Sequence, residues 1–353
     1  MSKSQRPDGG APDLSVRQAV DRWLGRLRLD RSDQTVSSYR RRLKHFVEWC
    51  EDEGFEHVDE LTAWDLDEYD THRRKTGIKA ISLNNELTTL RLFLDYCERV
   101  GLTEADLSDS IDPPTVDSGE ETDDEFFAPD DARRLLDAYR SGDDRYTREH
   151  AVFELVWWTG ARKGGLCALD LDDVNLEEGY VHFHHRPDSG TPLKNGSDGE
   201  RIVGISEDVV DALRGYIDEN RPTVTDDYGR EPLFASRQGR CHVSTLTQSV
   251  YFGTLPCRWG PCPHDRERET CEFYSRTNGF RCPSSTSPHP VRSGSIMWQL
   301  NRGLRADHVS DRVNATTDVI DRYYDKVTQL DEFRKRREGD ISKLGFDSQE
   351  DDK

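Results

Sequence analysis

The 353-residue sequence has little apolar content, and this shortage limits where the protein can reside. Hydrophobic residues make up 33% of the chain. No stretch reaches the roughly 18 consecutive apolar residues that predict a transmembrane helix. The first ten residues, MSKSQRPDGG, contain no apolar core of a secretory signal. A membrane span and a secretory leader are therefore not expected, and a cytoplasmic protein is predicted.

Lysine is also scarce, because it provides only ten of the 49 basic residues against 69 Asp and Glu. The net charge of −20 would ordinarily disfavour a polyanionic partner such as nucleic acid. In very concentrated salt, however, the Debye length falls to about 3 Å and such repulsion is screened. Acid-rich, lysine-poor composition suits a protein that must stay hydrated in such salt. We therefore predict a halophilic cytoplasm, with an ordinary acidic protein as the alternative.

The hydrophobic period of about 3.6 residues predicts four helices over residues 14–107. The first follows Leu14, the second begins after Ser32 or Asp33, Thr62 caps the third, and the fourth spans roughly 81–100. Trp64 is expected to face inward in the third helix. Four helices of this length predict a small helical domain.

Composition also marks the remaining boundaries. Residues 1–13 carry Pro and paired Gly and are predicted to be disordered. Residues 108–126 are acidic with a Pro-Pro pair, which is typical of a linker. A second domain is predicted over 127–330, followed by a charged tail over 331–353.

The second domain mixes helices with a few short strands. Strands are expected over 180–184 and 201–205, joined by a polar loop that contains Lys194, and Leu233-Phe234 resembles a short buried strand. A long helical segment is expected from Ser287 to Tyr324. The predicted fold class is therefore mainly α, with a helical N-terminal domain and an α+β domain that holds a small antiparallel sheet.

Two basic clusters interrupt the acidic surface of the helical domain. They comprise Arg40, Arg41, Arg42 and Lys44 in the second helix, and Arg73, Arg74 and Lys75 at the end of the third, with Lys79 nearby. A basic run is often only a solvated helix face. Two runs in one small domain favour a surface that follows the phosphate backbone of double-stranded DNA.

The motif S-P-H-P-V-R, residues 287–292, predicts a helix N-terminus that carries two phosphate-seeking groups. Ser287 suits the N-cap, and Pro288 suits the first helical position. His289 and Arg292 lie three residues apart and so share a face of the opening turn. A helix N-terminus with these side chains suits a phosphate oxygen. The alternative is a capped helix whose His and Arg face solvent.

The order of motifs resembles the tyrosine recombinase (phage integrase) family, in its Xer-like, haloarchaeal form. The motifs are T-G-A-R at 159–162, Lys194 in a strand–strand loop, H-x-x-R at 289–292, and a tyrosine near the end of the chain. The resemblance implies an N-terminal SAM-like core-binding domain and a catalytic domain. It also implies breakage and rejoining of DNA through a 3′-phosphotyrosyl intermediate, no cofactor for the chemistry, and a tetramer on DNA.

The resemblance also implies roles for individual residues. Arg162 and Arg292 would clamp the scissile phosphate, as bidentate guanidinium donors can. Lys194 would protonate the leaving 5′ oxygen, and His289 would move the proton of the nucleophile. A mobile turn lysine is the alternative for Lys194.

Tyr324 is predicted to be the nucleophile because relatives carry His-Tyr-Asp at this point, and Tyr323 is the alternative. Aromatic core packing is a further possibility for the pair. Two positions depart from the family pattern. Gly165 stands where many relatives have an acidic residue. Asn314 and Ala315 lie in the region where most have His or Trp, about nine residues before the tyrosine. Asn314 is an additional candidate catalytic residue, because it retains a hydrogen-bond donor.

Four of the eight cysteines crowd into residues 257–282, whereas the other four are scattered among apolar neighbours. The clustered residues are Cys257, Cys262, Cys271 and Cys282, with His264 as an alternative ligand. Cysteines clustered in a cytosolic chain suggest a structural Zn²⁺ site before a disulfide. Free buried thiols and a redox role remain the alternatives.

Two other functions are compatible with the sequence. One is a catalytically silent DNA-binding regulator of the same fold, which the departures at Gly165 and Asn314 suggest. The other is a zinc-dependent nuclease, which would need metal for cleavage and would leave no covalent adduct.

Overall fold

The chain folds into two units, residues 1–123 and 124–353. The computed structural model describes residues 14–103, 106–116 and 125–324, with side chains described up to Asp321. The predicted disorder of 1–13, residues 117–124 of the predicted linker and the tail at 331–353 lie outside these ranges. Within them, no helix is both long enough and apolar enough to cross a membrane.

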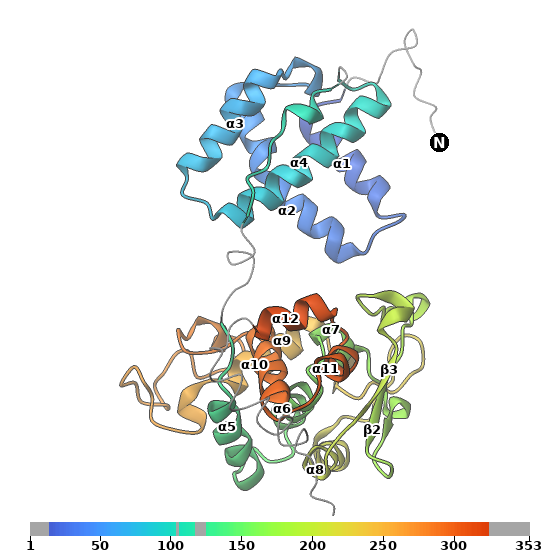
Figure 1. The fold of residues 1–353 in the computed structure, drawn as a ribbon, viewed down its shortest axis with the longest axis vertical. Helices are drawn as coiled ribbons and strands as arrows, with labels where there is room; N and C mark the ends of the chain where they lie inside the picture. The colour runs from blue at the N-terminus through green and yellow to red at the C-terminus, as the bar shows by residue number, and fades with distance from the viewer. Residues whose placement is uncertain (1–13, 104–105, 117–124, 325–353) are drawn as a thin grey trace, which may run out of the picture. The chain divides into compact units, whose positions relative to one another are not determined.

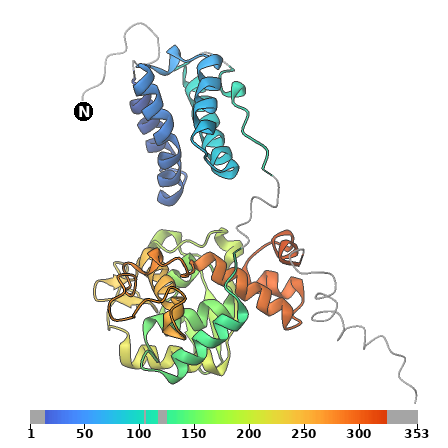
Figure 2. The same cartoon turned by 90° about the vertical axis from the view of Figure 1, so that its left-hand side faces the viewer.

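The first unit contains the four predicted helices. They are α1 (Val16–Leu27), α2 (Asp33–Glu53), α3 (Ala63–Lys75) and α4 (Ala80–Val100), with 3₁₀ turns at Val58–Glu60 and Ser108–Ser110. Ser15, Ser32 and Thr62 cap the first three helices through their side chains. The α2 helix packs against both α1 and α4 (Figures 1 and 2). These elements confirm the predicted helical domain.

Two details of this unit correct the sequence predictions. Trp64 is 69% exposed, because it lies in the first turn of α3 while the core-facing side presents Leu66 and Tyr69. The segment predicted as linker also begins later than expected. Ser108 donates its backbone N–H to Glu98, and Ile111 is buried in the same core. Residues 108–111 are therefore part of the helical unit.

The second unit is built mainly from helices. They are α5 (Pro129–Ser141), α6 (Arg148–Thr159), α7 (Lys163–Ala168), α8 (Glu207–Gly215), α9 (Val243–Gly253), α10 (Pro288–Asn301), α11 (Ala306–Val313) and α12 (Thr317–Tyr324). The strands are β1 (Val174–Asn175), β2 (Tyr180–Phe183), β3 (Arg201–Gly204), β4 (Ala235–Ser236) and β5 (Gly239–Arg240). Short turns connect them at Leu171–Asp173, Pro187–Ser189, Gly196–Gly199, Tyr216–Asn220, Pro256–Arg258 and Gly279–Arg281.

Three strands form an antiparallel sheet in the order β1-β2-β3 (Figure 1). Val181 pairs with Val203, and both are buried against the core. The short strand expected at Leu233-Phe234 instead begins at Ala235, although both residues are buried. The mainly α fold with a small antiparallel sheet is confirmed.

The long helix expected from Ser287 to Tyr324 is instead three helices. The chain turns after α10 at Gly303 and after α11 at Asn314, where φ is +86° and +51°. A left-handed residue cannot continue a right-handed helix, and Gly and Asn tolerate that conformation best. This correction matters because the turn at Asn314 brings α12 back against α10 and α11.

The α6 helix is the centre of the second unit. Ten of its twelve residues are buried, and α5, α8, α9 and α10 pack around it. Phe127, just before α5, donates its backbone N–H to the carbonyl of Pro290 in α10 at 2.9 Å. The missing side chain of Gly294 allows the Phe127 carbonyl to lie against the same helix. The start of this unit is thus fastened to α10.

Candidate active site

Arg292 lies in the first turn of α10 and is only 5% exposed. Its Nη1 donates to the carbonyl oxygens of Gly160 and Val313, the latter at 2.8 Å. The alternative in which His289 and Arg292 both face solvent is therefore wrong for Arg292. His289 is exposed, so the two side chains do not share an environment. Ser287 occupies the N-cap position but makes no side-chain cap hydrogen bond.

Arg162 approaches the same corner from α7. It holds the N-cap position of that helix, and its Nη1 donates to the backbone oxygen of Asn314 at 2.6 Å. Two arginines that are 130 residues apart in sequence therefore bind two adjoining turns, 160–162 and 313–314. This juxtaposition was expected from the family resemblance, but not from any local pattern.

The turn at Gly160 depends on glycine. Its φ is +59°, and a Cβ there would lie 2.7 Å from Cγ1 of Val313. Real Cβ atoms do not approach so closely, so any side chain would push Val313 away. Because Val313 and Asn314 both receive an arginine through their carbonyl groups, this close contact sets the spacing of Arg162 and Arg292.

Lys194 lies in the loop between β2 and β3, as predicted, and its side chain is exposed. Its neighbour Asn195 donates to Oδ1 of Asn314. Asn314 in turn donates to the backbone oxygen of Asp198 at 3.0 Å. Asn314 therefore binds the loop between β2 and β3 (residues 184–200, the lysine loop), rather than extending toward solvent as a phosphate donor.

The two candidate nucleophiles are at the end of α12. Ile320 of this helix is fully buried, together with Ile296, Leu300, Val309 and Val313. Tyr323 and Tyr324 follow Ile320 by three and four residues and are the last two residues of the helix. Their side chains lie outside the described residues.

Two arginines beside this corner were missed from the sequence. Arg201 and Arg312 form no ion pair with any described residue, and they donate mainly to backbone carbonyls. Burial, with the nearby charge of Arg162, lowers the pKa of Arg201 to about 10. For Arg201, the sequence offered one signal that could have identified it: a basic residue directly after the lysine loop, at the first position of a predicted strand.

Comparisons with known proteins match both units. The model for the phage integrase N-terminal SAM-like domain matches residues 20–101, and that for the phage integrase family matches residues 125–255. Together they cover more than half of the chain, and the second includes Arg162 and the Lys194 loop. The chain belongs to the tyrosine recombinase (phage integrase) family.

Several known proteins are similar to this chain. The tyrosine recombinase XerD of Staphylococcus epidermidis is 25% identical over 223 residues, covering 63% of this chain and 71% of its own. The Tn1549 transposon integrase, in complex with a circular intermediate DNA, is 16% identical, with a TM-score of 0.64 over 94% of this chain and 100% of its own. The N-terminal domain of a phage integrase/site-specific recombinase from Haloarcula marismortui is 42% identical over 29% of this chain and 99% of its own, with a TM-score of 0.29.

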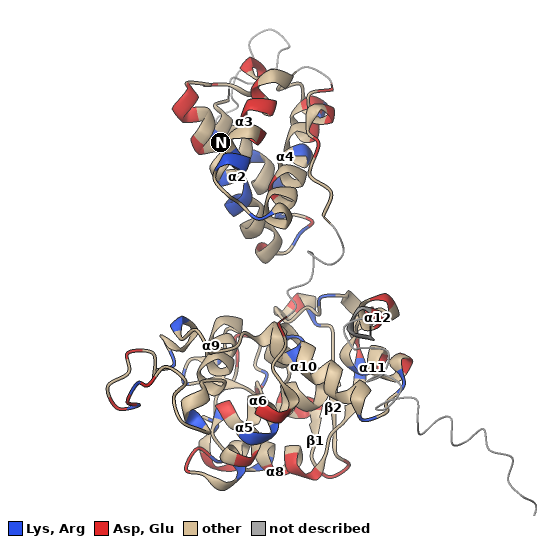
Figure 3. Ribbon diagram, turned by 60° about the vertical axis from the view of Figure 1, so that its left-hand side comes forward, with Lys and Arg blue, Asp and Glu red and all other residues tan. Residues whose placement is uncertain are grey.

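The basic clusters of the recombinase are on α2 and at the end of α3, and Figure 3 shows Lys and Arg gathered on α2. Arg73, which was predicted to contact DNA, does not belong to this surface. Arg73 is 9% exposed and donates through Nε and Nη2 to Glu86 at 2.6 and 2.9 Å, while Tyr69 donates to the same carboxylate. Arg73 therefore belongs to the domain core, and it is not available to DNA.

The other cluster residues remain at the surface. Arg40, Lys44 and Arg74 are exposed and pair with Asp21, Glu48 and Asp70, of which only Asp70 is half-buried. Exposed pairs of this kind are weak, so a phosphate can replace the acid at little cost. Arg41, Arg42, Lys75 and Lys79 form no ion pair with any described residue.

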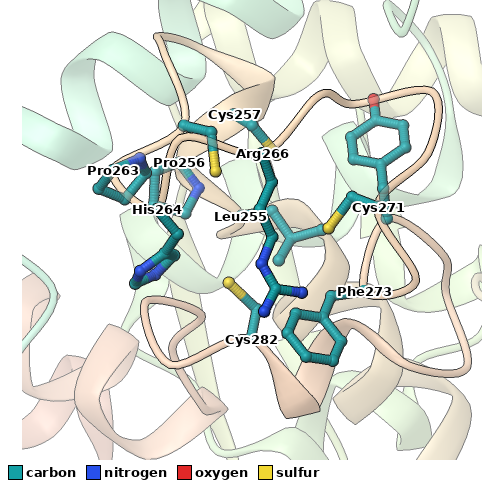
Figure 4. Close-up of a pocket in the computed structure, with 11 residues that line it drawn as sticks. Leu255, Pro256, Cys257, Pro263, His264, Arg266, Cys271, Phe273 and Cys282 are labelled. Atoms are coloured by element: carbon teal, nitrogen blue, oxygen red, sulfur yellow. The ribbon is translucent and has the colours of Figure 1, made fainter.

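The four clustered cysteines line one small pocket of the recombinase (Figure 4). Each is a free thiol of intermediate exposure. The four scattered cysteines were interpreted as small core residues, and Cys50, Cys97 and Cys241 are buried, whereas Cys167 is only of intermediate exposure. Arg266 also lines the pocket, and its side chain runs among the sulfur atoms in Figure 4. As they are placed, no three His, Cys, Asp or Glu side chains in the described residues form a group that holds a metal. His264 binds Ser284 instead.

Proposed function

We propose that this chain is a site-specific recombinase that breaks and rejoins double-stranded DNA through a covalent 3′-phosphotyrosyl intermediate. The observation that carries the proposal is the joint attachment of Arg162 and Arg292 to the turns at 160–162 and 313–314. The second of these turns leads directly into the helix of the two tyrosines. Family membership favours this function over a silent regulator or a zinc-dependent nuclease.

In this mechanism, the oxygen of Tyr324 attacks phosphorus and the bond to the 5′ oxygen breaks. The guanidinium groups of Arg162 and Arg292 stabilise the charge that develops on the non-bridging oxygens. His289, exposed at the helix N-terminus, takes the tyrosine proton, and Lys194 gives a proton to the leaving 5′ oxygen. The phosphotyrosyl bond retains the energy for rejoining, so no nucleotide cofactor is required.

A suicide substrate tests the proposal. A duplex nicked near the cleavage site loses its 5′-hydroxyl fragment after cleavage, so the covalent protein–DNA adduct accumulates. Wild-type protein in concentrated KCl is expected to give this adduct with and without EDTA. Tyr324→Phe is expected to abolish it, and Tyr323→Phe to retain it. The reverse pattern would make Tyr323 the nucleophile, whereas cleavage without adduct that EDTA stops would identify a metal-dependent nuclease.

We further propose that the exposed basic residues of α2 and α3 contact the phosphate backbone. Arg41→Ala and Lys75→Ala are each expected to weaken DNA binding and to reduce the slope of log K against log salt by about 1. Arg17→Ala provides the control, because Arg17 is exposed and pairs with Glu51 outside both clusters. An equal loss in all three variants would contradict a specific surface.

The acidic composition supports a further proposal, a halophilic, cytoplasmic setting. Family membership supports another, self-association on DNA as a tetramer on two recombining sites. We expect the free energy of unfolding to rise from dilute buffer to about 2–3 M KCl, as screening removes repulsion among surface acids. Full stability in dilute buffer would contradict halophily. Light scattering of the complex on paired sites would give the number of chains.

We also propose that Cys257, Cys262, Cys271 and Cys282 bind a structural Zn²⁺ after modest side-chain rotation. Between Pro256 and His289 only Gly279 is buried, so apolar packing does little to order this segment. A tetrathiolate site would supply the missing cross-link, and the nearby Arg266 would offset its negative charge. Elemental analysis is expected to give one zinc per chain, falling in Cys271→Ser but not in Cys50→Ser. Zinc well below one per wild-type chain would refute this site.

A further inference from the structure

Asn314, in the region where the family usually carries His or Trp, contacts three different parts of the second unit. Asn314 ends α11 with a left-handed backbone, φ +51°. Its Nδ2 donates to the Asp198 carbonyl at 3.0 Å, its Oδ1 accepts from Asn195, and its own carbonyl accepts from Arg162 at 2.6 Å. Thus a single residue binds the lysine loop, an active-site arginine and, through the chain, the start of α12.

A second attachment holds the other end of the same loop. Arg201 donates to the carbonyl of Arg312 at 2.7 Å and to that of Gly199 at 2.9 Å. Its guanidinium lies 4.2 Å from the ring of Phe183. Because Arg312 is in the last turn of α11, this contact fastens the first residue of β3 to the helix that Asn314 terminates.

The loop between these attachments is closely packed. Leu193 is 8% exposed. A Cβ on Gly199 would lie 3.1 Å from Cβ of Leu193 and 3.3 Å from Nδ2 of Asn314. Both flanks of the loop are therefore attached to the rest of the unit, while the side chain of Lys194 is exposed between them. This arrangement is unlike that of a turn lysine on a mobile loop.

We propose that Asn195, Asn314 and Arg201 form a clasp that positions Lys194 against Arg162 and the tyrosine helix. The inference rests on the proposed function. In the clasp, Asn314 is a positioning residue and does not contact the phosphate. It fixes the position of two groups at once: Lys194, which is the proton donor for the leaving oxygen, and the start of α12, the helix that carries the nucleophile.

Proton transfer provides a readout that a merely structural role would not affect. When the P–O5′ bond breaks, the 5′ oxygen leaves as an alcohol and takes its proton from Lys194. If sulfur replaces that bridging oxygen, the P–S bond breaks to a thiolate, which can leave without a proton because a thiol, with a pKa of about 8.5, is far more acidic than an alcohol. Such a substrate needs no general acid. A variant in which only the position of Lys194 is lost is therefore expected to recover its rate of adduct formation on the sulfur substrate.

The test compares adduct formation on oxygen and 5′-phosphorothiolate suicide substrates. Asn314→Gly removes the side chain, including the 3.4 Å contact of its Oδ1 with Nη1 of Arg162. It preserves the left-handed backbone and the carbonyl that accepts the shorter bond from Arg162, at 2.6 Å. It is expected to be about 100-fold slower than wild type on the oxygen substrate, as a misplaced group can cost, and within about fivefold of wild type on the sulfur substrate. Lys194→Ala is expected to show the same recovery. Asn220→Gly, which loses a similar bond to the Tyr146 carbonyl far along the chain, is expected to be normal on both.

The outcomes distinguish a failure of the clasp from a failure of the proposed function. If Asn314→Gly is slow on both substrates while Lys194→Ala recovers on sulfur, Asn314 acts on the phosphate or the fold, and the clasp is refuted. If Lys194→Ala does not recover, Lys194 is not the proton donor, and the inference also fails. If wild type forms no adduct with either substrate, the proposed function itself is overturned, together with the clasp. DNA affinity is expected to be unchanged in Asn314→Gly.

Discussion

Gly160→Ala is expected to damage both stability and cleavage, because the turn at Gly160 spaces the two active-site arginines. A non-glycine residue in the left-handed region costs about 1–2 kcal/mol. The added Cβ also lies 2.7 Å from Cγ1 of Val313, and forcing an extra carbon into a packed site costs about 1–3 kcal/mol more. Together these effects predict a loss of about 2–5 kcal/mol in the free energy of unfolding.

Gly303→Ala separates the two contributions. Gly303 has φ +86°, but a Cβ there would meet nothing within 4 Å. This variant is expected to lose only the conformational part, about 1–2 kcal/mol. Denaturant unfolding in concentrated KCl measures both losses. The difference between the variants, about 1–3 kcal/mol, is the cost of displacing Val313.

The same displacement is expected to slow cleavage. Val313 and Asn314 accept hydrogen bonds from Arg292 and Arg162, so moving them misaligns the phosphate clamp. Adduct formation by the folded fraction of Gly160→Ala is expected to fall about 100-fold, since a shift of about 1 Å can cost that much. If the two glycine variants lose equal stability and react equally fast, the close contact with Val313 does not set the active-site geometry.

Two further predictions concern buried charge. Glu86→Gln is expected to cost about 3–5 kcal/mol in denaturant unfolding, because it leaves the guanidinium of Arg73 buried without its carboxylate; a loss below about 1 kcal/mol would contradict the core assignment of Arg73. Burial alone raises the pKa of Asp226, but hydrogen bonds from Arg240 and from backbone N–H groups outweigh it and lower that pKa to about 2. Because the folded pKa lies below the ordinary value of 3.8, the stabilisation is full above about pH 4 and is lost toward pH 2. The stability gap between wild type and Asp226→Asn should narrow over that range in a pH series of unfolding curves, and a constant gap would contradict it.

Local signals predicted the helical domain almost to the residue. Ser32 and Thr62 cap the helices that follow them, and Gly54 and Gly101 end α2 and α4 in left-handed turns. Each of these signals acts within a few residues of the boundary that it sets. The chemistry of a cap or a left-handed terminus is therefore visible in the sequence.

Contacts between distant segments were not visible in the same way. Arg73, Arg74 and Lys75 form one basic run, yet only the position of Glu86 on α4 determines that Arg73 turns inward. Likewise, nothing near Asn314 in the sequence indicates that Asn195 and Arg162 will reach it. The family resemblance supplied the list of active-site candidates, but the contacts that position them are set by packing across more than 100 residues of sequence.

The hydrogen bond between Phe127 and Pro290 gives the connecting segment a mechanical role. The chain enters the second unit at this point and is bound to α10 two residues before Arg292. Tension along the connection would therefore be transmitted first to the turn that holds the buried arginine, rather than to the periphery of the unit. The backbone hydrogen bond, the approach of the Phe127 carbonyl to Gly294 and the buried Phe127 ring together attach this point of the chain to the helix that carries Arg292.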